Sequence, residues 1–374
     1  MPGLTVIQTL PALEVGGVER GTLEVAAELV RRGHRSIVIS AGGRLVSELT
    51  GAGSEHITLP IGKKSPLTLR YIRTLREILR ATGADILHAR SRLPAWISYL
   101  AWRGMPERER PRFITTVHGP NSVNRYSKVM TYGEQVIAVS RFMQRYILAS
   151  YPDTDPGRIT VIPRGVSPTA FPHGYRPDPD WLSRWQRDFP LLSDRFLLTL
   201  PGRISRRKGI EDFFALISAC RDTIPEVHGL IVGGPPPGKR KYFRQLQKTA
   251  HAMGLDEHIT FAGHRGDVRE IFSISNIVFM LSVKPESFGR TALEALTLGT
   301  PVIAYDHGGI SEVLQTILPE GLVGIGDLAG LTERVKEFHR SKPRVPAGHP
   351  YTLQRMLDDT LGLYQTAAQR QPTG

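Results

Sequence analysis

The 374-residue chain contains a single cysteine, Cys220. One cysteine excludes an intramolecular disulfide and favours a reducing compartment. Cys220 continues an apolar pattern that starts at Phe213 and Phe214. That setting predicts a packed thiol and not a nucleophile.

The sequence also lacks long apolar runs and a basic leader. Met1 leads directly into the strand-like segment 4–7, without the charged and apolar stretches of a signal peptide. The most apolar helical segment, 95–102, is far shorter than the ~20 residues that cross a bilayer. These absences predict a cytoplasmic protein that is either soluble or peripheral on the inner face of the cytoplasmic membrane.

Charge is abundant but unevenly distributed. The formal net charge is +13, and residues 1–168 hold 23 Lys and Arg against 13 Asp and Glu. Nucleic acid, an anionic membrane surface or a phosphate-rich acceptor would each explain a basic first half. No recognised nucleic-acid module or aromatic-interleaved basic patch is present, so nucleic acid is not expected as a partner.

Short apolar runs alternate with helical patterns, such as 18–32 and 67–81, along the whole chain. The predicted strands are 4–10, 36–40, 85–89, 113–117, 135–139, 159–162, 196–200, 229–232, 259–262, 277–281, 301–305 and 322–325. This alternation is typical of α/β proteins with a doubly wound parallel sheet. We expect two such domains, 1–168 and 196–345, joined by a Pro-rich and Asp-rich linker at 169–195, and a final helix within 352–374 that packs back on the first domain.

The first predicted strand is followed by a Gly-rich turn, Val15-Gly16-Gly17, that opens a helix. Glycines there allow the backbone to approach a phosphate or a sugar closely. The glycine spacing is not the dinucleotide fingerprint, and the second strand ends without an acid for a ribose. A nicotinamide-dependent dehydrogenase is therefore disfavoured.

The most specific motif is the segment 284–296, in which Glu286 and Glu294 flank seven residues. It resembles the donor site of retaining glycosyltransferases of family 4 (GT-4). A helix begins after Gly289, so its first N–H groups would bind a diphosphate. The resemblance implies that Glu286 accepts sugar hydroxyls and that Glu294 reaches the ribose. The residues assigned to donor binding in this segment are Phe288, Gly289, Arg290, Thr291 and Glu294.

A second motif, Gly202-Arg203 followed by Lys208-Gly209, ends the first strand of the second predicted domain. It resembles the family's Gly-Arg and Lys-Gly pair. When the bond between sugar and diphosphate breaks, negative charge grows on the leaving oxygen, and Arg203 and Lys208 would stabilise it.

Looser resemblances lie elsewhere. Residues 115–120 are similar to the family's strand-His-Gly segment, which implies that His118 binds the donor sugar. The loop after it suggests an acceptor wall made of Arg125, Tyr126 and Lys128. The segment 161–166 has Arg164 where the family usually has Asn. Two further stretches imply donor contacts from Gly234 and, with the nucleotide base, from Arg265.

No metal site is expected. Two pairs, Asp153/Asp155 and Asp178/Asp180, have a metal-binding spacing but lie in Pro-flanked segments, where Asp is a turn residue. The histidines of the second half do not share a zinc-ligand spacing.

A basic helix remains ambiguous. Its arginines at 70, 73, 76 and 80 fall on one face, beside an apolar stripe. That pattern suits a membrane surface, and it equally suits the solvated face of an ordinary α/β helix.

The resemblance covers essentially the whole chain and implies the GT-B fold, in which two Rossmann-like domains face a central cleft. It also implies a retaining, metal-independent transfer from a UDP-type or GDP-type nucleotide sugar, without a cofactor, to a glycolipid or saccharide such as lipopolysaccharide core. Two other readings stay open: a nucleotide-sugar epimerase or hydrolase of the same fold, and a non-catalytic protein that binds anionic lipid or nucleic acid.

Overall fold

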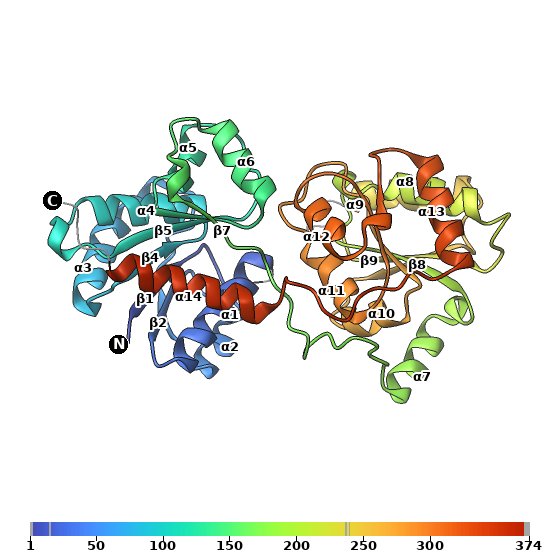
Figure 1. Ribbon diagram of the computed structural model, residues 1–374, viewed down its shortest axis with the longest axis horizontal. Helices are drawn as coiled ribbons and strands as arrows, with labels where there is room; N and C mark the ends of the chain where they lie inside the picture. The colour runs from blue at the N-terminus through green and yellow to red at the C-terminus, as the bar shows by residue number, and fades with distance from the viewer. Residues whose placement is uncertain (1–2, 15, 236–237, 239, 370–374) are drawn as a thin grey trace. The chain divides into compact units, whose positions relative to one another are not determined.

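The computed structural model describes residues 3–14, 16–235, 238 and 240–369 (Figure 1). The chain forms two compact units. The first unit comprises Met1–Arg164 together with Gln354–Gly374, and the second comprises Gly165–Leu353. The boundary therefore precedes the expected one at residue 168.

The first unit is built on a seven-stranded parallel sheet in the order β3-β2-β1-β4-β5-β6-β7. Its strands are β1 Thr5–Thr9, β2 Arg35–Ser40, β3 Glu55–Thr58, β4 Ile86–Ala89, β5 Arg112–Val117, β6 Gln135–Ala138 and β7 Ile159–Val161. Its helices are α1 Gly17–Arg31, α2 Val46–Gly51, α3 Tyr71–Thr82, α4 Arg92–Arg103, α5 Arg125–Lys128, α6 Arg141–Ser150 and α14 Leu353–Gln369. The buried strands form the core with residues such as Ile7, Leu87 and Phe113.

The sequence did not predict β3. This strand has the composition Glu-His-Ile-Thr, lies at the edge of the sheet and buries neither of its end residues. An edge strand that is half exposed needs no continuous apolar run, so hydrophobic periodicity does not reveal it.

The second unit holds a six-stranded parallel sheet in the order β10-β9-β8-β11-β12-β13, and all of its strands were predicted. They are β8 Phe196–Pro201, β9 Val227–Val232, β10 Ile259–Gly263, β11 Ile277–Met280, β12 Val302–Tyr305 and β13 Leu322–Val323. The helices are α7 Pro179–Asp188, α8 Ile210–Cys220, α9 Arg240–Ala252, α10 Val268–Ile274, α11 Arg290–Leu298, α12 Gly309–Ile317 and α13 Leu328–Arg340. Cys220 is buried in this core, and burial raises the pKa of its thiol to about 11.

Each sheet has a topological switch point, where the order of the strands reverses. It lies between β1 and β4 in the first sheet and between β8 and β11 in the second. Ligands of doubly wound sheets bind at the carboxyl ends of the strands beside such a point. We call this side of each sheet its carboxyl edge.

The expected linker at 169–195 is not an unstructured connection. It contains α7, which Asp178 caps through a hydrogen bond to the backbone N–H of Asp180. Trp185 of α7 is buried in the core of the second unit and stacks on Trp181. The Asp-Pro start of a helix is visible in the sequence, but three turns are too short for the apolar period to be counted.

The final helix, α14, belongs to the first unit, and Figure 1 shows it in red beside that unit's blue and cyan elements. Its Tyr364 hydroxyl lies 2.5 Å from Nδ1 of the buried His88 in β4. Gln354 hydrogen-bonds to Glu28 of α1, and Asp358 pairs with Arg32. The predicted helix within 352–374 therefore lies at Leu353–Gln369, and residues 370–374 are outside the described part.

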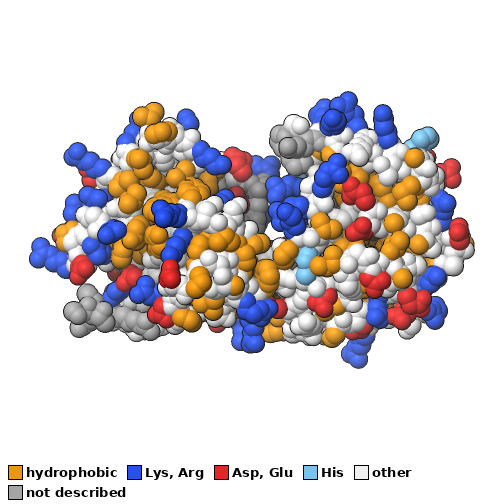
Figure 2. Space-filling model, turned by 90° about the horizontal axis from the view of Figure 1, so that it is seen from above, with side chains coloured by type: hydrophobic (Ala, Val, Ile, Leu, Met, Phe, Trp, Pro, Cys, Tyr) orange, Lys and Arg blue, Asp and Glu red, His pale blue; other side chains and the backbone are white. Residues whose placement is uncertain are grey.

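The predicted helix 67–81 divides into a 3-10 helix, Pro66–Arg70, and α3. Arg76 donates to the backbone carbonyl of Ala101 in α4, and Arg80 pairs with Glu109. On the face drawn in Figure 2, basic side chains of the first unit (left) are interspersed with hydrophobic and acidic ones and do not form one stripe. None of the described helices combines the length and hydropathy that a bilayer span requires.

Candidate active site

The switch point of the second sheet brings the two strongest motifs together. Lys208 follows β8, Glu286 follows β11, and Lys208 Nζ lies 2.6 Å from Glu286 Oε1. The hydroxyl of Ser282, two residues after β11, donates to the same oxygen at 2.6 Å. The sequence analysis missed Ser282, although its place at a strand end could have indicated it.

Glu286 remains a carboxylate in this arrangement. Burial raises the pKa of its carboxyl, but the charge and hydrogen bond of Lys208 and the hydroxyl of Ser282 outweigh burial, so the pKa lies below its ordinary value. The carboxylate can therefore only accept hydrogen bonds, as a group that binds sugar hydroxyls should.

Gly202 is required by the approach of Lys208. Its φ is +127°, and a Cβ at this position would lie 2.9 Å from Lys208 Cε. The missing side chain lets Lys208 lie against the end of β8.

The start of α11 has the local structure on which the predicted anion site depends. Gly289 has a φ of +93°, and a Cβ there would lie 2.9 Å from Cγ1 of Ile310. Its left-handed conformation starts the helix at Arg290. Phe288 is buried and contacts Tyr351 edge to face, which fixes the turn. The first N–H groups of α11, including that of Thr291, can bind an anion.

Other predicted donor residues have mixed surroundings. Arg290 Nε donates to Glu294 Oε1 at 3.3 Å, so these two side chains are coupled within α11. Arg203 is exposed. Gly234 leaves open space where a Cβ would be, and its carbonyl accepts from the N–H of Ile204 beside Arg203.

Arg265 has a different environment from the one expected. Its guanidinium donates twice to Asp267, at 2.9 and 2.5 Å, and lies over the rings of Trp185 and Phe189. These contacts connect α7 with the end of β10. The bidentate ion pair holds the Arg265 guanidinium against Asp267, so in this conformation these donors do not face a nucleotide base.

In the first unit, the predicted Gly-rich turn precedes α1. Gly16 stands directly before the helix, and Gly17 is exposed with open space where a Cβ would be. The predicted turn also included Val15, which lies outside the described residues. The backbone at Gly17 is accessible to a ligand.

His118 follows β5 and accepts a hydrogen bond at Nδ1 from Arg164 Nη2 over 2.5 Å. Burial, then Arg164, Arg90 and His88, hold the pKa of His118 well below its ordinary value, so the imidazole is neutral. Because Arg164 can only donate, the proton of His118 must lie on Nε2. That nitrogen is buried and has no partner among the described residues.

The predicted acceptor wall is divided. Lys128 pairs with Asp153 at 2.9 Å and lines a hollow of about 430 Å³ together with Tyr132. Tyr126 instead lies under the guanidinium of Arg92, and Arg125 is exposed. Tyr126 and Lys128 therefore have different partners, and the acceptor assignment stays a prediction.

Asp153 and Asp155 also line the hollow that contains Lys128. Asp155 accepts the backbone N–H of Gly157, and Asp178 caps α7, so one member of each Asp pair has a turn or capping role. Within the described ranges, no three His, Cys, Asp or Glu side chains gather as metal ligands.

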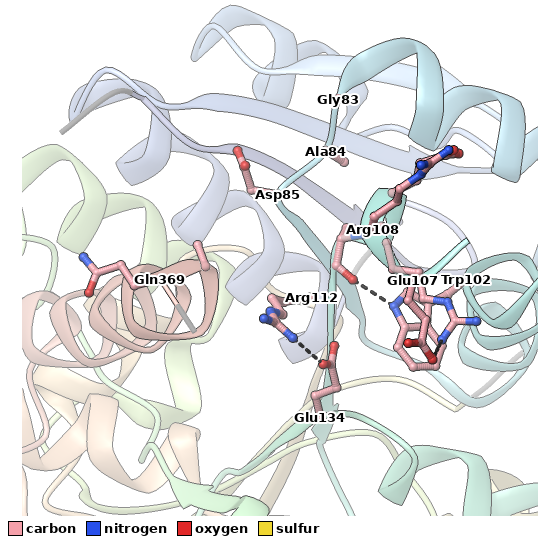
Figure 3. Close-up of a pocket in the computed structure, with 13 residues that line it drawn as sticks. Gly83, Ala84, Asp85, Trp102, Glu107, Arg108, Arg112, Glu134 and Gln369 are labelled. Carbon is pink, nitrogen blue, oxygen red and sulfur yellow. Dashed lines mark hydrogen bonds and ion pairs between the residues drawn. The ribbon is translucent and has the colours of Figure 1, made fainter. Parts of the chain in front are cut away.

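A hollow of about 650 Å³ lies at the opposite edge of the first sheet, where Asp85 precedes β4 and Arg112 begins β5 (Figure 3). Figure 3 shows Arg112 paired with Glu134 in this hollow, at 2.9 Å. It contains none of the predicted site residues. The candidate chemistry is therefore confined to the carboxyl edges.

Comparison with known families agrees with this arrangement. Residues 15–170 match the profile of Glycosyltransferase Family 4, and residues 183–338 match that of Glycosyl transferases group 1. The two matches lie mainly in the first and in the second unit, respectively.

Individual proteins are similar over nearly the whole length. A D-inositol 3-phosphate glycosyltransferase of Stackebrandtia nassauensis is 26% identical over 405 aligned positions, which cover 96% of this chain and 88% of that protein. A glycosyltransferase structure from Rickettsia africae has a TM-score of 0.85 at 28% identity and covers 99% of this chain and 100% of its own. The Anabaena protein HepE in complex with UDP-glucose has a TM-score of 0.74 at 20% identity, with 98% of both chains covered. The chain belongs to glycosyltransferase family 4 and has the GT-B fold.

Proposed function

We propose that the protein is a retaining, metal-independent glycosyltransferase that binds a UDP-type or GDP-type sugar at the carboxyl edge of the second sheet. The observation that carries this proposal is the Lys208–Glu286 pair beside the start of α11. A diphosphate bound at the N-terminus of α11 would meet the ammonium of Lys208 and the guanidinium of Arg203.

The chemistry requires cations at this position. The bond between the anomeric carbon and the diphosphate oxygen breaks, and negative charge develops on that oxygen. Lys208 and Arg203 stabilise the charge. The acceptor hydroxyl attacks from the same face and gives its proton to the leaving phosphate, a route that rests on family membership.

The sugar and the nucleoside have their own partners in this proposal. Glu286 accepts hydrogen bonds from hydroxyls of the donor sugar, and His118 donates to the sugar through Nε2. Glu294 accepts hydrogen bonds from the ribose. Arg265 reaches the base only if its ion pair with Asp267 opens, so we assign it a minor role.

The acceptor is proposed to be a glycolipid or saccharide that docks on the first unit, such as lipopolysaccharide core. The excess of Lys and Arg in residues 1–168 supports an anionic acceptor near an anionic membrane. Leu67 and Leu69 are 70% and 56% exposed and lie between the basic residues Lys64 and Arg70. Apolar side chains next to cations suit the inner face of the cytoplasmic membrane.

A panel of nucleotide sugars tests the proposal. The donor is first identified by the rise in melting temperature that a bound ligand produces. It is then incubated with deacylated and intact glycolipids, and the anomeric configuration of the product is read by NMR. Transfer with retained configuration is expected.

Other outcomes separate the alternatives. Rapid release of free sugar or an epimerised donor without an acceptor would identify a hydrolase or an epimerase. Binding without turnover for any donor would identify a non-catalytic protein.

A further inference from the structure

The carboxyl edge of the first sheet contains a buried arginine that the proposed reaction does not use. Arg90 directly follows β4 at the switch point and is 2% exposed. Its Nε donates to the side-chain carbonyl of Gln8 at 2.7 Å. Its Nη1 is buried and has no hydrogen-bond partner among the described residues.

A second guanidinium approaches the same place. Arg164, beyond the end of β7, has Nη1 3.3 Å from the point where a Cβ of Gly21 would lie. Arg90 Nη1 lies 3.9 Å from that same point. The Nη1 atoms of both arginines therefore converge on Gly21 in α1.

The face of α1 that meets them is free of side chains. Gly17 and Gly21 are one helical turn apart and thus on one face. Gly17 is exposed, with nothing near its Cβ position, whereas Gly21 is buried. The backbone of α1 is therefore exposed at Gly17, one turn before the arginines at Gly21.

The charge of Arg90 is placed in an unfavourable environment. Burial lowers the pKa of Arg90, and Tyr364 and Glu24 offset this only in part. An arginine nevertheless stays protonated in a protein. His118, the partner of Arg164, is neutral and adds no negative charge. Arg90 is buried and Arg164 is partly exposed, and two neighbouring cations repel each other, so an anion between them is favoured.

We propose that Arg90 and Arg164 bind a phosphate ester carried by the acceptor, at the glycine face of α1. The inference rests on the proposed function, because it names a chemical class for the acceptor. A phosphate has several acceptor oxygens and no need to donate, which matches a set of guanidinium donors. The start of α1 adds a favourable dipole. The donor diphosphate has its own cations in the second unit, so this site serves a second anion.

Binding of inorganic phosphate tests the site without turnover. The measurement is the phosphate-dependent rise in melting temperature of the full-length chain carrying Arg203→Ala and Lys208→Ala. These two changes remove the side-chain cations that are proposed to bind the donor diphosphate. Adding Arg164→Asn should weaken the apparent affinity for phosphate about tenfold or more. Arg158→Asn, at the other end of β7 and exposed, is the matched control and should leave the affinity unchanged.

Arg164→Lys should restore part of the affinity because it keeps the charge but not the fork geometry. Arg164 is partly exposed, so its replacement is expected to fold even where that of Arg90 is not. An equal phosphate effect in Arg164→Asn and in the control, or no effect in the starting protein, would overturn the site.

Sugar phosphates then distinguish an ester from free phosphate. Glucose 6-phosphate should bind more tightly than phosphate, and glucose should not bind. In turnover with the otherwise unaltered enzyme, Arg164→Asn should raise the KM for a phosphorylated acceptor at least tenfold and the KM for its dephosphorylated form much less, whereas any change in the donor KM reports the contact of Arg164 with His118. Phosphate binding without any transfer would refute the proposed function and keep the site, whereas equal use of phosphorylated and dephosphorylated acceptors would refute the acceptor assignment.

Discussion

At the residue scale, the contact between Lys208 and Glu286 couples two roles. Lys208 holds the carboxylate that is proposed to bind the sugar, and it also supplies charge to the leaving group. The ground-state part of its interaction with the diphosphate should appear in KM, and the part that grows as the bond breaks should appear in kcat.

Replacing Lys208 by Ala should therefore lower kcat strongly and raise KM to a smaller extent. Losing one preorganised donor of this kind costs about 10²–10³-fold in kcat. Kinetics at saturating donor measure the effect. Arg206→Ala is the control, because Arg206 donates to Gln245 and lies over the ring of Tyr242 and does not contact Glu286 in the described part of the chain. A kcat within about threefold of the parent would leave under ~1 kcal/mol for Lys208.

Glu294 should behave differently, since a ribose contact exists before the chemistry as well as during it. Glu294→Ala is expected to raise the donor KM about tenfold or more, because it removes a charged hydrogen-bond acceptor, and to change kcat little. Glu333→Ala, an exposed glutamate of α13, provides the control. A collapsed kcat at unchanged KM would assign Glu294 to catalysis.

Candidate site residues could be identified from the sequence where their neighbours along the chain form a recognisable motif. Lys208 and Glu286 were both identified and lie in contact. Ser282 and Arg90 were missed because each acts through a position relative to other strands, which no local pattern records. The ion pair of Arg265 with Asp267 and its place over Trp185 were not foreseen, because Trp185 belongs to a helix within the segment expected to be a linker.

At the element scale, α14 is attached to α1 by Glu28. The pKa of the Glu28 carboxyl is lowered to about 2. The largest cause is the hydrogen bond from Arg31; burial opposes it, and hydrogen bonds from Arg32 and Gln354 lower the pKa further. A lowered folded-state pKa contributes stability above the unfolded value of about 4.5, and this contribution is lost as the pH falls toward 2.

Glu28→Gln should thus destabilise the first unit by up to about 3 kcal/mol near neutral pH. Hydrogen exchange of the α1 and α14 amides at pH 7 and pH 3 provides the measurement, and the difference from the parent should shrink at the lower pH. Glu77→Gln, in an exposed pair with Arg73, should show little effect at either pH. If the loss of stability in Glu28→Gln is the same at both pH values, side-chain packing and not the charge of Glu28 would account for the attachment of α14.

The structure changes how the membrane hypothesis for α3 should be tested. Arg76 and Arg80 have partners in the protein, so replacing them would disturb packing. Arg70→Gln with Arg73→Gln removes two charges more cleanly. If the segment meets an anionic bilayer, binding to phosphatidylserine vesicles should weaken about thirtyfold, at roughly 1 kcal/mol per charge.

Arg103→Gln with Arg108→Gln makes the same change of charge at other exposed positions of the first unit. An equal loss in both pairs would indicate diffuse attraction, and no loss in either would make α3 an ordinary solvated helix.

At the scale of the whole molecule, the proposed replacement of a metal by protein cations has a direct consequence. Transfer should continue at an unchanged rate in excess EDTA, because Arg203, Lys208 and the start of α11 supply the positive charge. The rate of product formation before and after addition of EDTA decides this. Complete loss that Mg²⁺ or Mn²⁺ restores would refute it.

The overall architecture was largely predictable because alternation of strands and helices constrains a doubly wound sheet closely. All twelve predicted strand segments overlap observed strands, whereas β3 was not predicted because it lacks an apolar run. The final helix was expected to pack back on the first domain, because no strand follows it in the sequence. In the structure, the Tyr364 hydroxyl of α14 contacts the buried His88 of the first unit.

The membership of α14 in the first unit also bears on how the protein is made. The second unit is one continuous stretch, Gly165–Leu353, inserted between two parts of the first. During synthesis every residue of the inserted unit is translated before the helix that covers His88. Until α14 has been made, the face of the first unit that contacts Tyr364 stays exposed, whereas the second unit has its complete sequence. A released chain that ends at residue 353 should therefore be protease-sensitive in its first 164 residues and resistant in the rest.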